Sequence, residues 1–307
     1  MAMFQGEFWE LVDGIIDDIC VDESYDIQEI NEVVMVGSQT QTWEDEMEFA
    51  GPTFASVKPE DTAIEEVDIA RGYKNRRYLV TFALKMAFSE ELEEEGPSGA
   101  FSKVTDATRW LRQSMGRTHN YEGMDFFRKA WDTTETVIAA SLPLCSASHT
   151  LPRGGTYSNT LSPPLTPSAN ALEVMSTLAR QMPDRQGLRG DFKLWKIVHP
   201  VDQDHIWEKV LGAEKDPVLG NFVIPSAVKK LGISHMGLVD WDNTGTNWGA
   251  LTSVQKDYGK KGLFIGWKYK TRTNKWVDND TGRVMYSAKM RRSRSVFDPR
   301  CFFGSQA

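Results

Sequence analysis

The chain has 307 residues, 40% of them hydrophobic and 25% charged, which is typical of a globular protein with a sizeable core. No run of about eighteen apolar residues occurs, so the sequence predicts no membrane-spanning helix. Its acidic N-terminal stretch is unlike a secretory signal or a transit peptide. The three cysteines are odd in number and far apart, which excludes a disulfide framework and favours assembly in a reducing cytoplasm.

The net charge of −8 is divided unevenly along the chain. Residues 1–70 carry a large excess of carboxylates, whereas residues 256–300 are rich in lysine and arginine. Such segments attract each other, within one chain or between copies, or bind separate partners. The alternative is that both are solvated faces. A basic segment also suits nucleic-acid phosphates, but this one lacks the aromatic pattern of a single-strand binder.

The N-terminal part of the chain predicts three elements. Apolar residues recur every three or four positions over residues 4–19, with acids between them, which indicates an amphipathic helix. Residues 38–78 place single apolar residues among polar and acidic ones, which predicts an extended hairpin or long loop with little of its own to bury. Such a segment is typically functional or packs on a partner. Residues 80–88 alternate and predict a half-buried strand.

The rest of the chain mixes helices and strands. A helix of thirty-odd residues is expected over about 101–136, with Gly123 as one of its weak points. Ser168 is expected to start a second helix, residues 193–200 to form a buried strand that ends at a proline, and residues 263–297 to form antiparallel strands. No regular βαβ repeat occurs, so the predicted class is α+β.

Cys145 and His149 are the first candidates for catalysis, because a thiol beside a histidine can act as a nucleophile with its base. Residues four apart meet on a helix, but Pro143 and Pro152 flank the pair and disfavour a helix there. A zinc site would need two further ligands nearby, and the other cysteines and histidines are scattered. The sequence therefore favours a packed cysteine and a hydrogen-bonded histidine.

The remaining candidates also favour structural roles. His199 and His205 straddle a predicted helix start and are expected to cap or pack. Glu65 and Glu66 lie in a polar run with no apolar pocket that would raise the pKa of a carboxyl group, so they indicate a solvated face. We expect no catalytic residue, no metal site and no cofactor.

Three stretches resemble segments of the major capsid proteins of tailed phages, in a Mu-type branch of major head subunits. Residues 144–175 (LCSASHTLPRGGTYSNTLSPPLTPSANALEVM) resemble the stretch that leads into the axial domain: small residues, glycines, Ser-Asn and then a helix rich in Leu and Ala. Residues 222–237 (FVIPSAVKKLGISHMG) are similar to that family's strand-to-helix segment, and residues 291–307 (RRSRSVFDPRCFFGSQA) to its C-terminal ending. The order of the expected elements is similar as well.

This resemblance implies a Hong Kong 97-type capsid fold of the α+β class. Residues 1–37 would form an N-terminal arm and residues 38–79 an extended hairpin, the E-loop. Residues 80–144 and 256–307 would form a peripheral domain with the long helix as its spine. Residues 145–255 would form an axial domain.

The resemblance also implies a shell subunit rather than an enzyme. Hexamers and pentamers would build an icosahedral head around double-stranded DNA, which they enclose without sequence-specific binding. The expected partners are copies of the chain, a separate scaffolding protein, a portal and decoration proteins. No membrane is involved: assembly would occur in the host cytoplasm, and the final location would be the virion capsid.

The acidic and basic segments would then meet between copies. The candidates for these contacts between subunits are Glu44, Glu46, Glu48, Glu65, Glu66, Arg291, Arg292 and Arg294. Two alternatives stay open at this point. One is an encapsulin-like compartment shell, which shares the fold but holds a cargo enzyme. The other is a cytoplasmic cysteine-dependent hydrolase that uses Cys145.

Overall fold

A computed structural model of the chain describes residues 29–64, 66–88, 97–133, 142–212, 228–241, 246–257, 262–278 and 283–306, together with positions 14, 19 and 280. For residues 97–102 it describes the backbone. Apart from positions 14 and 19, the helix predicted over residues 4–19 lies outside these ranges. Within them, no helix has both the length and the apolar character that crossing a bilayer requires.

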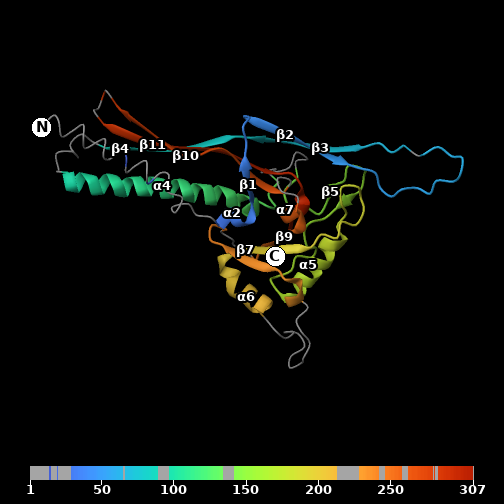
Figure 1. The fold of residues 1–307 in the computed structure, drawn as a ribbon. Coiled ribbons are helices and arrows are strands. Elements are labelled where there is room, and N and C mark those ends of the chain that lie inside the picture. The colour runs from blue at the N-terminus through green and yellow to red at the C-terminus, as the bar shows by residue number, and fades with distance from the viewer. Residues whose placement is uncertain are drawn as a thin grey trace.

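Two four-stranded sheets organise the described chain (Figure 1). The first has the order β1–β10–β11–β4, formed by β1 (Met35–Ser38), β10 (Leu263–Val277), β11 (Val284–Val296) and β4 (Val80–Phe88). Strand β1 is parallel to β10, and the other neighbours are antiparallel. The strand predicted over residues 80–88 is β4, but it is more exposed than expected: Phe82, Met86 and Phe88 are partly buried, whereas Val80 and Leu84 are exposed. The predicted C-terminal antiparallel strands are β10 and β11.

The long helix α4 (Pro97–Arg128) runs along the first sheet (Figure 1). Leu111 and Met115 of this helix are buried with Ala288 and Met290 of β11. This small apolar cluster holds the helix against the sheet, because each of its members removes apolar surface from water.

The helix begins and ends earlier than the predicted range of 101–136. Its end at Arg128 has a local cause. The Ala130 amide donates to the Phe127 carbonyl at 3.3 Å, and the Ala130 carbonyl accepts from the Cys145 amide at 2.7 Å. Since Ala130 is fully buried, the chain turns into the core at this point and leaves the helix axis.

The segment between the arm and the first sheet is an antiparallel hairpin. Strand β2 (Trp43–Ala50) pairs with β3 (Ala70–Tyr78), and residues 51–69 form the loop that joins them. In Figure 1 this loop extends away from both sheets. The extended hairpin that the polar pattern predicts is thus present.

The second sheet has the order β12–β9–β7–β8. Its strands are β7 (Leu194–Pro200), β8 (Ser234–Leu238), β9 (Trp248–Thr252) and β12 (Phe302–Ser305). Strand β8 is parallel to β7, whereas β9 is antiparallel to both β7 and β12. The buried strand predicted over residues 193–200 is β7, and it ends at Pro200 as expected.

Three helices lie with the second sheet: α5 (Ala169–Gln181), α6 (Asp204–Gly212) and α7 (Ser253–Asp257). The Ser168 hydroxyl accepts a hydrogen bond from the Ala171 amide at 3.2 Å and caps α5, which confirms the predicted start of this helix. The short elements are α2 (Glu29–Val33), β5 (His149–Thr150), β6 (Thr156–Tyr157) and the 3₁₀ turns Val201–Gln203, Lys229–Leu231 and Pro299–Cys301.

Two strands depart from the expected division of the chain. The resemblance places residues 256–307 together with the long helix, yet β12 joins the second sheet beside β9. In this ladder Phe302 lies opposite Leu251 of β9, and both side chains are fully buried, so β12 contributes to the core on the side of the second sheet. Strand β1, expected in the arm, pairs with β10 and is part of the first sheet.

One large apolar core serves both parts of the chain. It includes Ile265 and Val296 from the first sheet, Ile197 and Trp248 from the second, and Leu172 from α5. The two sheets are therefore joined through shared packing. Tyr73 of β3 packs against the same core, whereas the loop of the hairpin extends away from it.

Candidate assembly surfaces

The hairpin loop, residues 51–69, exposes large apolar side chains to solvent. Phe54 is 81% exposed, Val57 93% and Ile64 80%. Three large apolar side chains this exposed within one loop make the loop a candidate for contact with another protein. In the sequence these residues are isolated apolar positions in a polar run. This pattern predicted a segment with little of its own to bury.

The two strands of the hairpin are held together by ion pairs across the ladder. Asp45 accepts from Arg76 at 2.6 Å and lies 2.5 Å from Lys74. Arg77 contacts Glu44 at 2.5 Å and Glu46 at 3.3 Å. Opposite charges on facing strands stabilise a ladder, so Glu44 and Glu46 have partners within their own hairpin.

Glu48 lies at the base of the hairpin in a buried cluster of charges. It is 1% exposed, and its Oε1 lies 3.5 Å from Arg300 Nη1 and 3.7 Å from Arg185 Nε. Asp298 contacts the same two arginines at 3.0 Å. Burial raises the pKa of Glu48 against the opposing effect of Arg300. This differs from the expectation of a contact between copies, because an ion pair inside the subunit buries the carboxylate.

Arg292 and Arg294 of β11 also have partners within the chain. Arg292 is 2% exposed and donates to Nδ1 of His119 at 2.8 Å. Arg294 contacts Asp125 of α4 at 2.9 Å. Both arginines therefore tie the first sheet to the long helix. The buried position of Arg292 inside one subunit differs from the contact between copies that we expected for it.

The other three contact candidates occupy different environments. Arg291 is half-buried on β11, opposite Thr81 of β4. Glu66 is exposed in the hairpin loop. Glu65 lies outside the described residues. Contact of Arg291 and Glu66 with another copy stays a prediction.

Cys145 and His149 form no catalytic pair. Cys145 is buried, and burial raises the pKa of its thiol well above the ordinary value, the reverse of what a nucleophile needs. His149 Nε2 lies 3.2 Å from the Leu144 carbonyl and 3.1 Å from Oδ1 of Asn159. Since both partners accept, Nε2 carries a proton and donates. The expected packed cysteine and hydrogen-bonded histidine are confirmed.

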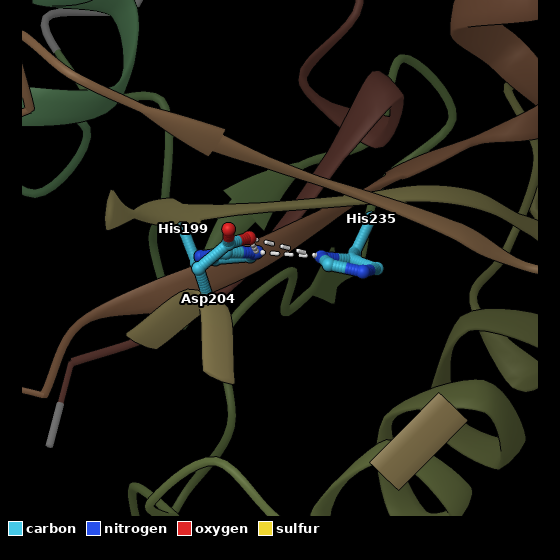
Figure 2. A group of neighbouring side chains, drawn as sticks. All are labelled: His199, Asp204 and His235. Atoms are coloured by element: carbon cyan, nitrogen blue, oxygen red, sulfur yellow. Dashed lines mark hydrogen bonds and ion pairs between the residues drawn. The ribbon is translucent and has the colours of Figure 1, made fainter. Parts of the chain in front are cut away.

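A second group of side chains has the chemistry of a metal site. His199, Asp204 and His235 direct ring nitrogens and a carboxylate oxygen toward one another (Figure 2). Sequence reasoning missed this group, because its members come from β7, α6 and β8 and meet through the parallel pairing of β7 with β8.

Comparison with known proteins gives similarity at the level of structure. No protein-family model and no curated protein matches the chain. A chain of Microbacterium phage Oxtober96 is similar with a TM-score of 0.55 and 8% identity over 90% of each chain. The capsid of an empty GTA particle is similar with a TM-score of 0.54 and 14% identity, over 91% of this chain and 90% of that one. The mature capsid of bacteriophage PhiM1 is similar with a TM-score of 0.53 and 9% identity, over 90% of this chain and 85% of that one.

The chain has a phage capsid fold. The similarity extends over about nine tenths of its length and confirms the Hong Kong 97-type α+β architecture that the three sequence stretches predicted. With identities of 14% or less, what is shared is the arrangement of strands and helices rather than particular residues. Among the described residues, the hairpin loop carries the most exposed large apolar side chains.

Proposed function

We propose that the chain is a major capsid protein, whose copies assemble as hexamers and pentamers into an icosahedral phage head around double-stranded DNA. The observation that carries this proposal is the exposed apolar loop, residues 51–69, on a chain with a capsid fold. Fully burying a side chain such as Phe54 or Ile64 contributes about 1.5–3 kcal/mol. A neighbouring copy that covers the loop supplies this stabilisation at every repeat of the shell.

The proposal includes the expected assignment of residues to an arm, an E-loop and two domains. The hairpin, residues 38–79, would lie across a neighbouring subunit as an E-loop, and residues 1–37, apart from the β1 residues that join the first sheet, would form an arm. The first sheet with α4 would form the peripheral domain, from residues 80–144 and 256–307 without β12. Residues 145–255, joined by β12, would form the axial domain around the five-fold and six-fold contacts.

The proposal includes no catalytic step. The buried Cys145, with its raised thiol pKa, gives no support to a cysteine-dependent hydrolase. Two of the similar structures reported above are described as capsids. A scaffolding protein, a portal and decoration proteins remain expected partners, with assembly in the host cytoplasm and a final location in the virion.

Negative-stain microscopy of the purified chain tests the proposal. We expect closed shells of roughly tens of nanometres, or capsomers that light scattering detects. The double variant Val57→Ser/Ile64→Ser should abolish them while changing the free energy of unfolding of the subunit by about 0.5 kcal/mol or less, as surface substitutions do. Shells formed equally well by this variant, or a strictly monomeric wild type at high concentration, would contradict the proposal.

The matched control replaces two exposed apolar residues outside the hairpin, Val201→Ser/Val239→Ser (46% and 66% exposed), and should leave shells intact. The encapsulin-like alternative predicts the same shells, so the contents decide between the two. Particles from the native source should contain double-stranded DNA. A protein cargo in place of DNA would favour the compartment shell.

A further inference from the structure

Two histidines and an aspartate meet at the end of β7. His199 lies on β7 and is fully buried, Asp204 begins α6 with a side chain that is 59% exposed, and His235 lies on β8 with a side chain that is 26% exposed. Figure 2 shows the three side chains pointing toward one another. We propose that they bind one divalent transition-metal ion of the zinc class.

The hydrogen bonding of His199 prepares it as a ligand. Its Nδ1 lies 2.9 Å from the Pro200 carbonyl, and because a carbonyl oxygen can only accept, Nδ1 carries the proton and Nε2 presents a lone pair. A histidine that donates one ring N–H to a backbone carbonyl, with its other nitrogen directed at the ion, is the usual outer-shell arrangement of metal sites.

The lone pair of His199 faces two more groups that can donate electron pairs. Nε2 of His199 lies 3.2 Å from Nδ1 of His235 and 3.8 Å from Oδ1 of Asp204. Nδ1 of His235 lies 3.4 Å from the same oxygen. Nδ1 of His235 therefore faces two electron-pair donors at once. A cation at the centre satisfies all three atoms at once.

The three distances fit an ion of this size. The point equidistant from the corners of a triangle with sides of 3.2, 3.8 and 3.4 Å lies about 2.0 Å from each of them, close to zinc–nitrogen and zinc–oxygen bonds of about 2.0–2.2 Å. Two imidazoles and one carboxylate suit Zn²⁺ and its neighbours in the transition series, whereas Mg²⁺ and Ca²⁺ take oxygen ligands.

The surroundings leave room for the ion and give it a structural effect. At position 237, opposite His199 in the β7–β8 ladder, a Cβ atom would lie 3.3 Å from Oδ1 of Asp204 and 3.4 Å from Cε1 of His199, and glycine avoids this crowding. The ion would connect β7, β8 and the start of α6. Three protein ligands leave a coordination position for water, and the exposed side of Asp204 gives access from solvent.

Titration of ZnCl₂ into the metal-free, tag-free full chain, followed by calorimetry, tests the site. We expect one Zn²⁺ per chain, with affinity reduced about tenfold or more in His235→Ala and in Asp204→Asn. Both substituted side chains are partly exposed, and circular dichroism verifies that each variant is folded. His205→Ala is the matched control, because His205 is exposed next to Asp204 and belongs to no part of the cluster; it should bind as the wild type does.

Co²⁺ gives a second readout, since bound Co²⁺ should show the visible absorption of a four-coordinate site in the wild type and lose it in His235→Ala. A wild type that binds no Zn²⁺, an unchanged affinity in both ligand variants, or equally tight binding of Mg²⁺ would overturn the site and leave a hydrogen-bonded pair of histidines. Metal binding is measured independently of shell formation, so its failure is distinct from failure of the capsid function.

Discussion

His119 is a neutral histidine held in the interior between the long helix and the first sheet. Its Nδ1 accepts from Arg292 at 2.8 Å, its Nε2 lies 3.1 Å from Oδ1 of Asn31, and its ring lies 4.8 Å from that of Trp267. Burial first, and then the charges of Arg292 and Arg112, lower the pKa of His119 from 6.5 to about 3. The folded chain therefore excludes a proton that the unfolded chain accepts below about pH 6.5.

This difference makes stability depend on pH. Between pH 6.5 and pH 3 the unfolded state binds more protons at His119, so its contribution is fully present above pH 6.5 and is lost as the pH falls. From pH 7 to pH 5 we expect the free energy of unfolding to fall by about 2 kcal/mol from this residue. Glutamine has no ionisable group in this pH range, so the free energy of unfolding of His119→Gln should fall less between pH 7 and pH 5 than that of the wild type. Denaturant unfolding of the unassembled subunit at the two pH values measures the difference.

His205→Gln is the control for this prediction, because His205 is exposed on α6 and should keep the wild-type pH dependence. If His119→Gln loses stability between pH 7 and pH 5 as steeply as the wild type does, the neutral buried state of His119 is wrong.

At the residue scale, sequence reasoning predicted the role of a residue correctly where that role depends on neighbouring positions in the chain. Prolines beside Cys145 and His149 argued against a catalytic pair, and the buried, raised-pKa thiol of Cys145 agrees with that expectation. It failed for Glu48, whose partner Arg300 lies far away in the sequence and meets it at the base of the hairpin. Composition revealed the opposite charges of the two segments, but no periodicity indicates which charges are buried together inside one subunit.

At the scale of elements, Gly123 shows how a weak point in a helix can be a packing requirement. A Cβ atom at position 123 of α4 would lie 2.5 Å from Cγ1 of Ile30, and Ile30 of the short helix α2 is fully buried. The glycine therefore allows α2 to approach the long helix closely, at the expense of intrinsic helix propensity.

Gly123→Ala should accordingly destabilise the subunit by about 1–3 kcal/mol through overpacking, although alanine is the better helix former by about 1 kcal/mol. Gly212→Ala in α6 is the matched control, because a Cβ atom there meets nothing within 4 Å, and it should be neutral or stabilising. Urea denaturation of the two variants measures the difference. A more stable Gly123→Ala variant would show that α2 does not pack against α4 at this position.

The elements themselves were largely predictable. The alternation of β4, the polar hairpin, the serine that caps α5 and the final antiparallel pair all follow from local patterns, and each is present. The pairing of strands was not predictable to the same degree. Strand β12 joins the second sheet and β1 joins the first by pairing with segments far away in the sequence. A sequence pattern indicates which faces of a strand are buried but not which strand lies beside it.

At the scale of the whole molecule, the divided charge predicts how subunits meet. Glu65 and Glu66 belong to the acidic segment, and Glu66 is exposed in the hairpin loop. Glu65→Lys/Glu66→Lys should impair assembly more than it impairs folding of the monomer, and high salt should weaken early capsomers because it screens exposed charges. Sedimentation of assembled and unassembled protein, with circular dichroism of the monomer, measures both effects. An equal loss of soluble monomer would place these residues in the subunit core.

The order of the chain within its two sheets has a consequence for synthesis. The centre of the first sheet, β10 and β11, and one edge of the second, β12, all come from residues 263–305. A nascent polypeptide still attached to the ribosome can therefore complete neither sheet until this segment has emerged. Long-range strand pairing is also slow. The hairpin loop with its exposed apolar side chains is translated before this segment, so premature association of unfinished chains is a hazard during synthesis.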